Sequence, residues 1–264
     1  MDLRLTSTKA ARFLTLPTDV YVGKSLEVYG EWSHGEIEQL AALLKPADNV
    51  VEAGANIGAH SVFIGRDLCP AGTLYAFEPR RILYQMLCAN LMLNGVGNVE
   101  AFQLALGESE GAMREGPLPL GGPVNAGAFG LGTIAGDEEE IRIVALDAML
   151  DRLKPVALLK ADVEGHEMKL LKGAAALVAR DRPILYLEND RPELSEALVG
   201  HVLGLGYEAW WHKVPLFRPN NHAATGVNIF GKIHSFNMLC FPGERAVNVT
   251  GEKIVDPAHH PLRR

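Results

Sequence analysis

The chain has 264 residues, of which 48% are hydrophobic and 22% charged, a balance that excludes a disordered polypeptide and suits one α/β domain with a buried core. The formal net charge is −7 and no basic stripe follows an expected helix, which argues against a nucleic-acid partner. No apolar stretch has the length of a signal peptide or a membrane-spanning helix, and the three cysteines lack metal-type spacing. We therefore expect a cytoplasmic protein with free thiols and no membrane span.

The chain is expected to divide into three parts. Residues 1–45 form an N-terminal extension that carries an entry helix over about 35–44, and residues 46–245 form the main α/β domain. Residues 246–264 are expected to be a C-terminal tail, in which His259 and His260 would be solvated.

Short apolar runs alternate with amphipathic segments through the main domain. Strands are expected at 50–53, 74–77, 99–105, 157–161 and 184–187, and helices at about 58–68, 81–93, 167–179 and 193–203. Strands separated by helices form right-handed βαβ units, which predicts a mostly parallel sheet with helices on both faces. Two later strands, near 207–211 and 237–241, would complete seven strands, one of them antiparallel.

One segment, 111–136, interrupts the alternation and is rich in glycine and proline. A long loop of this composition inside a compact domain is either disordered or a functional lid, and the sequence leaves both open.

The first strand-to-helix turn and the end of the second strand predict a nucleoside-binding site. The turn contains Gly54 and Gly58, which allow the backbone to approach a ligand at the carboxyl edge of the sheet. Glu78 ends the second strand, where an acid can accept hydrogen bonds from both ribose hydroxyls. A surface glutamate with no such role is the simpler alternative.

The same turn favours S-adenosylmethionine over a dinucleotide. A dinucleotide site requires closely spaced glycines so that pyrophosphate can lie on the helix N-terminus. Here Asn56 takes the middle position, and the spacing from Gly54 to Gly58 does not match. S-adenosylmethionine has no phosphate, and Glu52 together with the backbone of the turn could bind its amino acid part.

Over about 36–242, the chain resembles the FkbM family of methyltransferases. The resemblance rests on the ordered stretches Val51–Gly58, Tyr75–Pro79, Asn90–Asn94, Ala105–Gly107, Leu146–Asp147, Leu158–Glu167 and Leu171–Ala174. It implies a Rossmann-like class I methyltransferase fold, S-adenosylmethionine as methyl donor, and a hydroxyl acceptor on a sugar, polyketide or similar natural product. It also implies that Gly54 and Glu78 contact the cofactor. On this side of the site we further place Glu52, Asn56, Gly58 and Ala105.

The loop after the fourth strand offers the catalytic candidates. Methyl transfer to an alcohol requires an aligned acceptor and a base near its oxygen. Asp162, Glu164 and His166 follow that strand at the carboxyl edge, and Asp162 is the first choice as base. His166 stands where the family pattern more usually has a small residue. Glu167 is better explained as an acid that stabilises a helix N-terminus.

The fifth strand ends in Glu188 and Asn189, which leaves two interpretations open. With Asp162, these side chains could supply oxygen ligands to Mg²⁺ that grips the acceptor oxygen. They could equally hold the acceptor by hydrogen bonds without a metal. His34 and His222 are further candidates for contacts with the acceptor.

The function expected from the sequence is therefore O-methylation of a small-molecule or glycan acceptor. N-methylation of an amine or amide stays open, because the cofactor side of the site would be the same. An NAD-type enzyme is disfavoured by Asn56, and a protein that binds the cofactor without catalysis is the remaining possibility. The acceptor and the oligomeric state, a homodimer included, are not written in the sequence.

Overall fold

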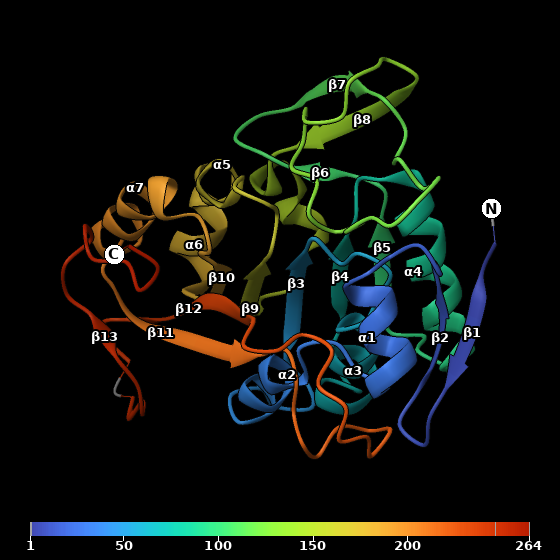
Figure 1. Ribbon diagram of the computed structural model, residues 1–264. Coiled ribbons are helices and arrows are strands. Elements are labelled where there is room, and N and C mark those ends of the chain that lie inside the picture. The colour runs from blue at the N-terminus through green and yellow to red at the C-terminus, as the bar shows by residue number, and fades with distance from the viewer. Residues whose placement is uncertain (1, 246, 264) are drawn as a thin grey trace.

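A mostly parallel sheet of eight strands forms the centre of the protein (Figure 1). The computed structural model describes residues 2–245 and 247–263. The strands are, in spatial order, β13 (Lys253–Ile254), β11 (Tyr207–Pro215), β12 (His234–Pro242), β10 (Ile184–Glu188), β9 (Val156–Ala161), β3 (Asn49–Ala53), β4 (Leu74–Phe77) and β5 (Val99–Phe102). Strands β10, β9, β3, β4 and β5 pair in parallel, and β12 is antiparallel to both β10 and β11. The predicted α/β class is confirmed, with β13 added to the seven expected strands.

Two apolar layers bury the sheet because adjacent residues of each strand point to opposite faces. Val50 packs in one core cluster and Val51 in the other, and Leu158 and Leu159 divide in the same way. The first layer holds α1 (Val22–Tyr29), α2 (His34–Ala41), α3 (Ser61–Phe63), the π-helix Ile64–Leu68 and α4 (Arg81–Leu93). The second layer holds the 3₁₀ helix Leu146–Arg152, α5 (Glu167–Lys172), α6 (Ala175–Asp181) and α7 (Pro192–Gly204). Within the described ranges, no helix is both long and apolar enough to cross a membrane.

Two predicted elements are broken in the structure. The expected helix over 167–179 is two helices, α5 and α6, because Gly173 lies against another segment: a Cβ there would be 1.9 Å from the carbonyl oxygen of Gly107. The expected strand over 99–105 ends at Phe102, and Ala105–Leu106 forms β6 in a separate sheet.

This second sheet stands over the carboxyl edge of the central one, at the top of Figure 1. It contains β6 (Ala105–Leu106), β8 (Glu139–Val144) and β7 (Gly111–Glu115), in that spatial order. Strand β7 takes up the start of the glycine-rich segment, and the rest of that segment runs back toward the central sheet.

The N-terminal extension is more structured than predicted, because it contains a hairpin as well as helices α1 and α2. The hairpin strands are β1 (Arg4–Ser7) and β2 (Arg12–Thr15). On the edge of β2 that does not pair with β1, two asparagines bond its backbone: Asn90 of α4 and Asn94, the C-cap residue of that helix. The Asn90 amide group accepts from Leu14 N at 2.7 Å and donates to Leu14 O at 3.1 Å. Asn94 makes the same pair of bonds to Arg12.

The C-terminal segment is packed against the domain, so the prediction of a solvated tail is wrong for part of it. Strand β13 pairs with β11 and buries Ile254. His260 is 1% exposed; its ring lies 5.0 Å from Trp211, and its Nε2 is 2.9 Å from Asn189 O. His259 is exposed, as predicted.

Candidate functional site

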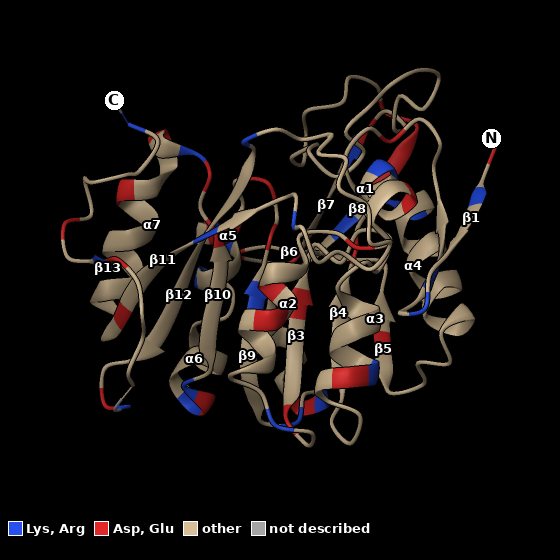
Figure 2. Ribbon diagram, turned by 60° about the horizontal axis from the view of Figure 1, so that its bottom comes forward, with Lys and Arg blue, Asp and Glu red and all other residues tan. Residues whose placement is uncertain are grey.

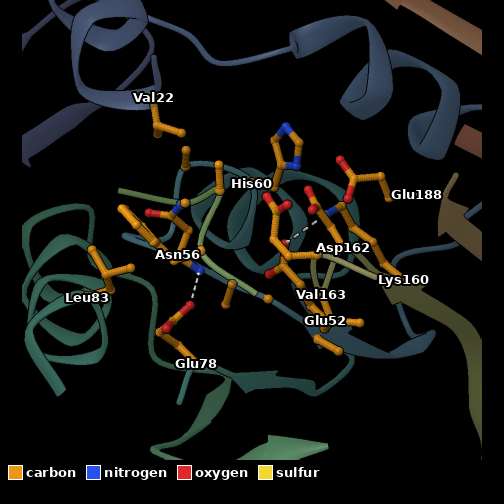
Figure 3. A pocket seen from close by; sticks show the side chains of 18 of the residues that line it. Val22, Glu52, Asn56, His60, Glu78, Leu83, Lys160, Asp162, Val163 and Glu188 are labelled. Carbon is orange, nitrogen blue, oxygen red and sulfur yellow. Dashed lines mark hydrogen bonds and ion pairs between the residues drawn. The ribbon is translucent and has the colours of Figure 1, made fainter. Parts of the chain in front are cut away.

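A cavity of about 300 Å³ opens at the carboxyl ends of β3, β4, β9 and β10. Its floor is the sheet edge, and three other segments wall it: the N-terminal extension at Trp32 and Glu36, the glycine-rich segment at 125–131, and the start of β12 at 234–236. Figure 3 shows two sides, with Asn56, Glu78 and Leu83 on one and Lys160, Asp162 and Glu188 on the other. This is where open α/β sheets bind ligands.

The turn after β3 is shaped by close approach of the backbone. Gly54 has a φ of 80°, and a Cβ at this position would lie 1.8 Å from the carbonyl oxygen of Asp162. Asn56 also has a positive φ, and its side chain accepts from Ile57 N at 2.7 Å. The turn therefore uses one of its own N–H groups internally, and the regular helix begins only at Ser61.

Glu78 is fixed beneath this turn (Figure 3). One carboxyl oxygen accepts from Asn56 N and the other from Arg80 N, both at 2.9 Å. Burial raises the pKa of Glu78 to about 7, although both backbone hydrogen bonds act to lower it. A preformed acceptor thus faces the cavity at the end of β4.

A buried lysine links the ends of β3 and β9. In Figure 2 the charged position of β9 is blue and that of β3 is red, side by side. Lys160 Nζ lies 3.9 Å from both Glu52 Oε1 and Asp162 Oδ2, and the Ser61 hydroxyl donates to Glu52 Oε2 at 2.5 Å. Burial acts to lower the pKa of Lys160, but Asp162, Glu52 and two further acids outweigh it, so that pKa is raised. Asp162 is the exposed member, with 34% of its side chain accessible.

Carboxyl groups gather on the opposite side of the cavity from Glu78. Burial raises the pKa of Glu164 to about 7 and that of Glu188 well above its usual value, and the charge of Asp162 adds to both shifts. Arg191 forms an ion pair with Glu164 and lies 3.8 Å from Glu188. The Oε2 atom of Glu188 is buried without a hydrogen-bond partner in the described part of the chain. This side can therefore present both a protonated and an ionised carboxyl group.

The glycine-rich segment roofs the cavity and is anchored by Arg80. The Arg80 guanidinium pairs with buried Glu115 and donates to Phe129 O at 2.9 Å and Gly130 O at 3.3 Å. A Cβ at Gly127 would lie 2.5 Å from the Asn56 side chain, so the roof touches the turn directly.

With this geometry established, comparison with known proteins decides the family. Residues 52–208 match the model of the methyltransferase FkbM domain. The chain belongs to the FkbM methyltransferase family. The resemblance predicted from the sequence motifs is thereby confirmed.

The chain is also similar to two named methyltransferases and to one solved structure. The chain is 32% identical over 155 residues to "Methyltransferase sdnD" of Sordaria araneosa, covering 47% of this chain and 59% of that protein. It is 29% identical over 184 residues to "Methyltransferase 1" of Beauveria bassiana, covering 61% of this chain and 73% of that protein. A solved structure, methyltransferase FkbM from Methylobacillus flagellatus, aligns at 17% identity and a TM-score of 0.49, covering 74% of this chain and 44% of that one. The chain thus spans less than two thirds of the length of some relatives that it matches.

Most site residues predicted for this FkbM chain line the cavity. They are Glu52, Gly54, Asn56, Glu78, Ala105, Asp162, Glu164, His166 and Glu188. Four predicted residues do not line it: His34, Gly58, Asn189 and His222.

Each of these four has another place in the structure. The Asn189 amide donates to Ser195 Oγ at 3.0 Å and to Met238 Sδ at 3.2 Å, so it is directed into the core instead of joining Asp162 and Glu188. Gly58 gives room for close packing, since a Cβ there would lie 2.9 Å from Leu87. His34 and His222 contact each other outside the cavity.

The sequence patterns missed several charged residues of the cavity. Arg80, Arg191 and Glu36 all line it, but none was selected. Arg80 and Arg191 each follow an acid that was selected, Glu78 and Glu188, and this proximity is a signal that could have identified them. Glu36 depends on the fold, because it is held by hydroxyl groups from both Ser33 and Ser235.

Proposed function

We propose that the chain is an S-adenosylmethionine-dependent methyltransferase that methylates a hydroxyl group of a small molecule or glycan. The proposal rests on two neighbouring observations. Glu78 is buried beneath the turn and accepts from Asn56 N, and the N–H group of Ile57 donates to the Asn56 side chain instead of pointing to a ligand. Such a site can accept hydrogen bonds from a ribose but offers little to a pyrophosphate. It therefore favours a nucleoside without phosphates.

The residues of the cavity fit such a cofactor. Glu78 would hold the ribose, and the turn that begins at Gly54 would lie against the cofactor. Gly54 itself leaves no room for a side chain, because the backbone oxygen of Asp162 lies against it. Glu52 and Lys160 form the polar pair near which an amino acid moiety would bind. When bound, the cofactor supplies a methyl group on a sulfonium, which is already activated for displacement.

The acidic side of the cavity is proposed to bind the acceptor and to remove the proton of its hydroxyl group. Asp162 is partly exposed beside the Lys160 ammonium, and its carboxylate can accept the proton that a hydroxyl group loses. Burial and the neighbouring acids raise the pKa of Glu188, which favours its protonated form, and that form can donate a hydrogen bond that orients the acceptor oxygen. The roof at 125–131 would exclude water and act as a lid.

A magnesium-assisted variant of this proposal has partial support. Oxygen atoms of Asp162, Glu164 and Glu188 lie within 4.8 Å of one another, a group that fits a hard cation. The ligand set would include Glu164 in place of the predicted Asn189, and Arg191 would have to yield part of its pairing with Glu164. Turnover that is lost in EDTA and restored by Mg²⁺ would select this variant, and turnover unaffected by EDTA would reject it.

Calorimetric titration with S-adenosylhomocysteine and, separately, NAD⁺ tests the cofactor assignment. We expect micromolar binding of the homocysteine compound and none of NAD⁺. Glu78→Gln keeps the side-chain shape and should weaken binding by about 1.5–3 kcal/mol, as for hydrogen bonds to a charged group. Glu100→Gln, on the exposed surface of β5, is the matched control. Binding of NAD⁺ alone, or of neither ligand, would overturn the assignment.

Methyl transfer itself is tested with a panel of hydroxyl and amine acceptors and labelled methyl donor. Asp162→Asn should lower kcat by at least about 100-fold, as expected for loss of a general base, while the affinity for S-adenosylhomocysteine changes little. Labelled product from amines only would replace O-methylation by N-methylation. Unchanged turnover in Asp162→Asn would remove Asp162 as the base.

A further inference from the structure

Two histidines and a glutamate from distant parts of the chain meet outside the cavity. Glu31 precedes α2, His34 begins α2, and His222 lies in the connection between β11 and β12. Their possible ligand atoms all lie within 4.8 Å of one another, and the two imidazole rings are 4.5 Å apart, edge to face. None of the three lines the cavity described above.

Two nitrogen atoms of this cluster lack a partner. Nδ1 of His34 and Nδ1 of His222 are both buried, and neither has a hydrogen-bond partner among residues 2–245 and 247–263. An unsatisfied buried polar group costs about 1–3 kcal/mol, so a pair of them in one place requires an explanation. His222 Nδ1 lies 3.7 Å from Glu31 Oε2, a separation that an ion between the two atoms would account for.

The electrostatics of the cluster suit a divalent cation. Arg218 donates to both oxygens of Glu31, at 2.7 and 2.9 Å, and also contacts Glu38. One guanidinium against two carboxylates leaves a net negative charge, and the bidentate contact fixes the orientation of Glu31 as the outer partners of metal ligands do.

We propose that Glu31, His34 and His222 bind one zinc ion, with water as the fourth ligand. Zinc is commonly held by imidazole nitrogen and carboxylate oxygen in a tetrahedron, with bonds of about 2.0–2.2 Å. Ligand atoms at such bond lengths are roughly 3.3–3.5 Å apart, so small side-chain rotations would close this cluster on the ion. The proposal stands independently of methyl transfer.

The ion would connect two segments that border the cavity and lie far apart in the sequence, one at Trp32 and one at Leu216. Trp32, between Glu31 and His34, lines the cavity, and so does Leu216 at the end of β11. A shared ion would hold the segment 31–34 against the connection 216–233 and so fix the shape of the entrance.

Metal binding by the untagged full-length chain tests the proposal. The chain is first freed of metals and then dialysed against Zn²⁺. Elemental analysis should then find one Zn²⁺ per chain, and adding Zn²⁺ to the metal-free chain should raise its Tm. His34→Ala and His222→Ala should each weaken Zn²⁺ binding by at least tenfold and abolish the rise in Tm. His201→Ala, on α7, is the matched control and should bind as the unaltered chain does.

Substitution with Co²⁺ identifies the ligand atoms. We expect ligand-field absorption of a tetrahedral ion without the near-ultraviolet band of a thiolate ligand. A thiolate band would assign the metal to a cysteine and overturn the proposal. Failure of the unaltered chain to bind Zn²⁺, or full binding by both histidine variants, would overturn it as well. Circular dichroism of each variant separates loss of a ligand from loss of the fold.

Discussion

Gly54 illustrates how one residue can control the whole site. Its positive φ would strain any other residue, and its closest neighbour is the backbone oxygen of Asp162, which cannot move away as a side chain can. The chain segments that follow β3 and β9 can therefore approach each other only because Gly54 has no side chain.

Gly54→Ala should destabilise the protein by about 3–5 kcal/mol, because backbone strain and a clash with backbone act together. Gly95→Ala is the matched control: its φ of 67° is similar, but a Cβ there meets nothing within 4 Å. The control should lose only about 1–2 kcal/mol, the cost of the left-handed conformation. Urea unfolding of both variants measures the difference, and equal losses would contradict the importance of the close approach.

Glu78 should make stability depend on pH in a predictable direction. Its pKa is about 7 in the folded protein and 4.5 in the reference state, so the folded state holds the proton more tightly. The contribution of Glu78 to the free energy of unfolding is full below pH 4.5 and is lost as the pH rises through 7.

Glu78→Gln should therefore gain stability relative to the unaltered chain as the pH rises from 5.5 to 8. The expected change in the stability difference is about 2 kcal/mol, from the separation of the two pKa values. Unfolding in urea at several pH values measures it. A stability difference for Glu78→Gln that stays level with pH would contradict the raised pKa.

At the scale of elements, the glycine-rich segment depends on the turn after β4 for its position. Arg80 is 5% and Glu115 1% exposed, so their ion pair is removed from water. Removing one partner of such a pair leaves the other charge buried, which is far more costly than losing a surface pair.

Arg80→Met should cost about 3–5 kcal/mol and release the roof, because buried Glu115 loses its countercharge and two backbone carbonyls lose one of their hydrogen bonds. Hydrogen exchange should increase within 116–136. The neighbouring Arg81→Met is the matched control, since its pair with Glu139 is exposed and contributes at most about 1 kcal/mol. Protection of 116–136 that survives Arg80→Met would show that other contacts hold the roof.

The elements that sequence reasoning predicted well are those with strong periodic patterns. Strands β3, β4, β9 and β10 lie close to their expected limits, because their apolar residues are buried on both faces of the sheet. Helix α4 was predicted as well, because its buried residues recur along one face. The acids Asp162 and Glu164 line the cavity as expected, because the end of a parallel strand places its next residues at the carboxyl edge of the sheet. Their catalytic role stays a prediction.

The misplaced residues depended on long-range contacts. The direction of the Asn189 side chain is set by Ser195 and Met238, the latter on β12, and nothing near Asn189 in the sequence indicates it. The sequence around Asn90 and Asn94 indicates only polar residues at the end of a helix. In the structure, their side chains bond to a hairpin more than 70 residues earlier in the chain. Short strands such as β13 are also invisible to periodicity, because two residues show no repeat.

At the scale of the whole molecule, the C-terminal segment completes the edge of the sheet beside β11. His260→Ala should destabilise the protein by about 2–3 kcal/mol, because it removes a buried ring packed on Trp211 and a partner of Asn189 O. His259→Ala, at an exposed position, should change stability by less than about 0.5 kcal/mol. Thermal unfolding of the two variants at equal concentration makes the comparison. Similar Tm values for both would show that the last residues contribute nothing to the fold.

The walls of the cavity also impose an order on its assembly during synthesis. Residues 52–106 supply the turn, Glu78 and the floor near them, whereas Leu216 and the start of β12 at 234–236 come much later in the chain. A chain emerging from the ribosome therefore contains the residues around Glu78 long before those that wall the cavity at Leu216 and 234–236. Until residues 216–236 have been translated, the cavity lacks that side.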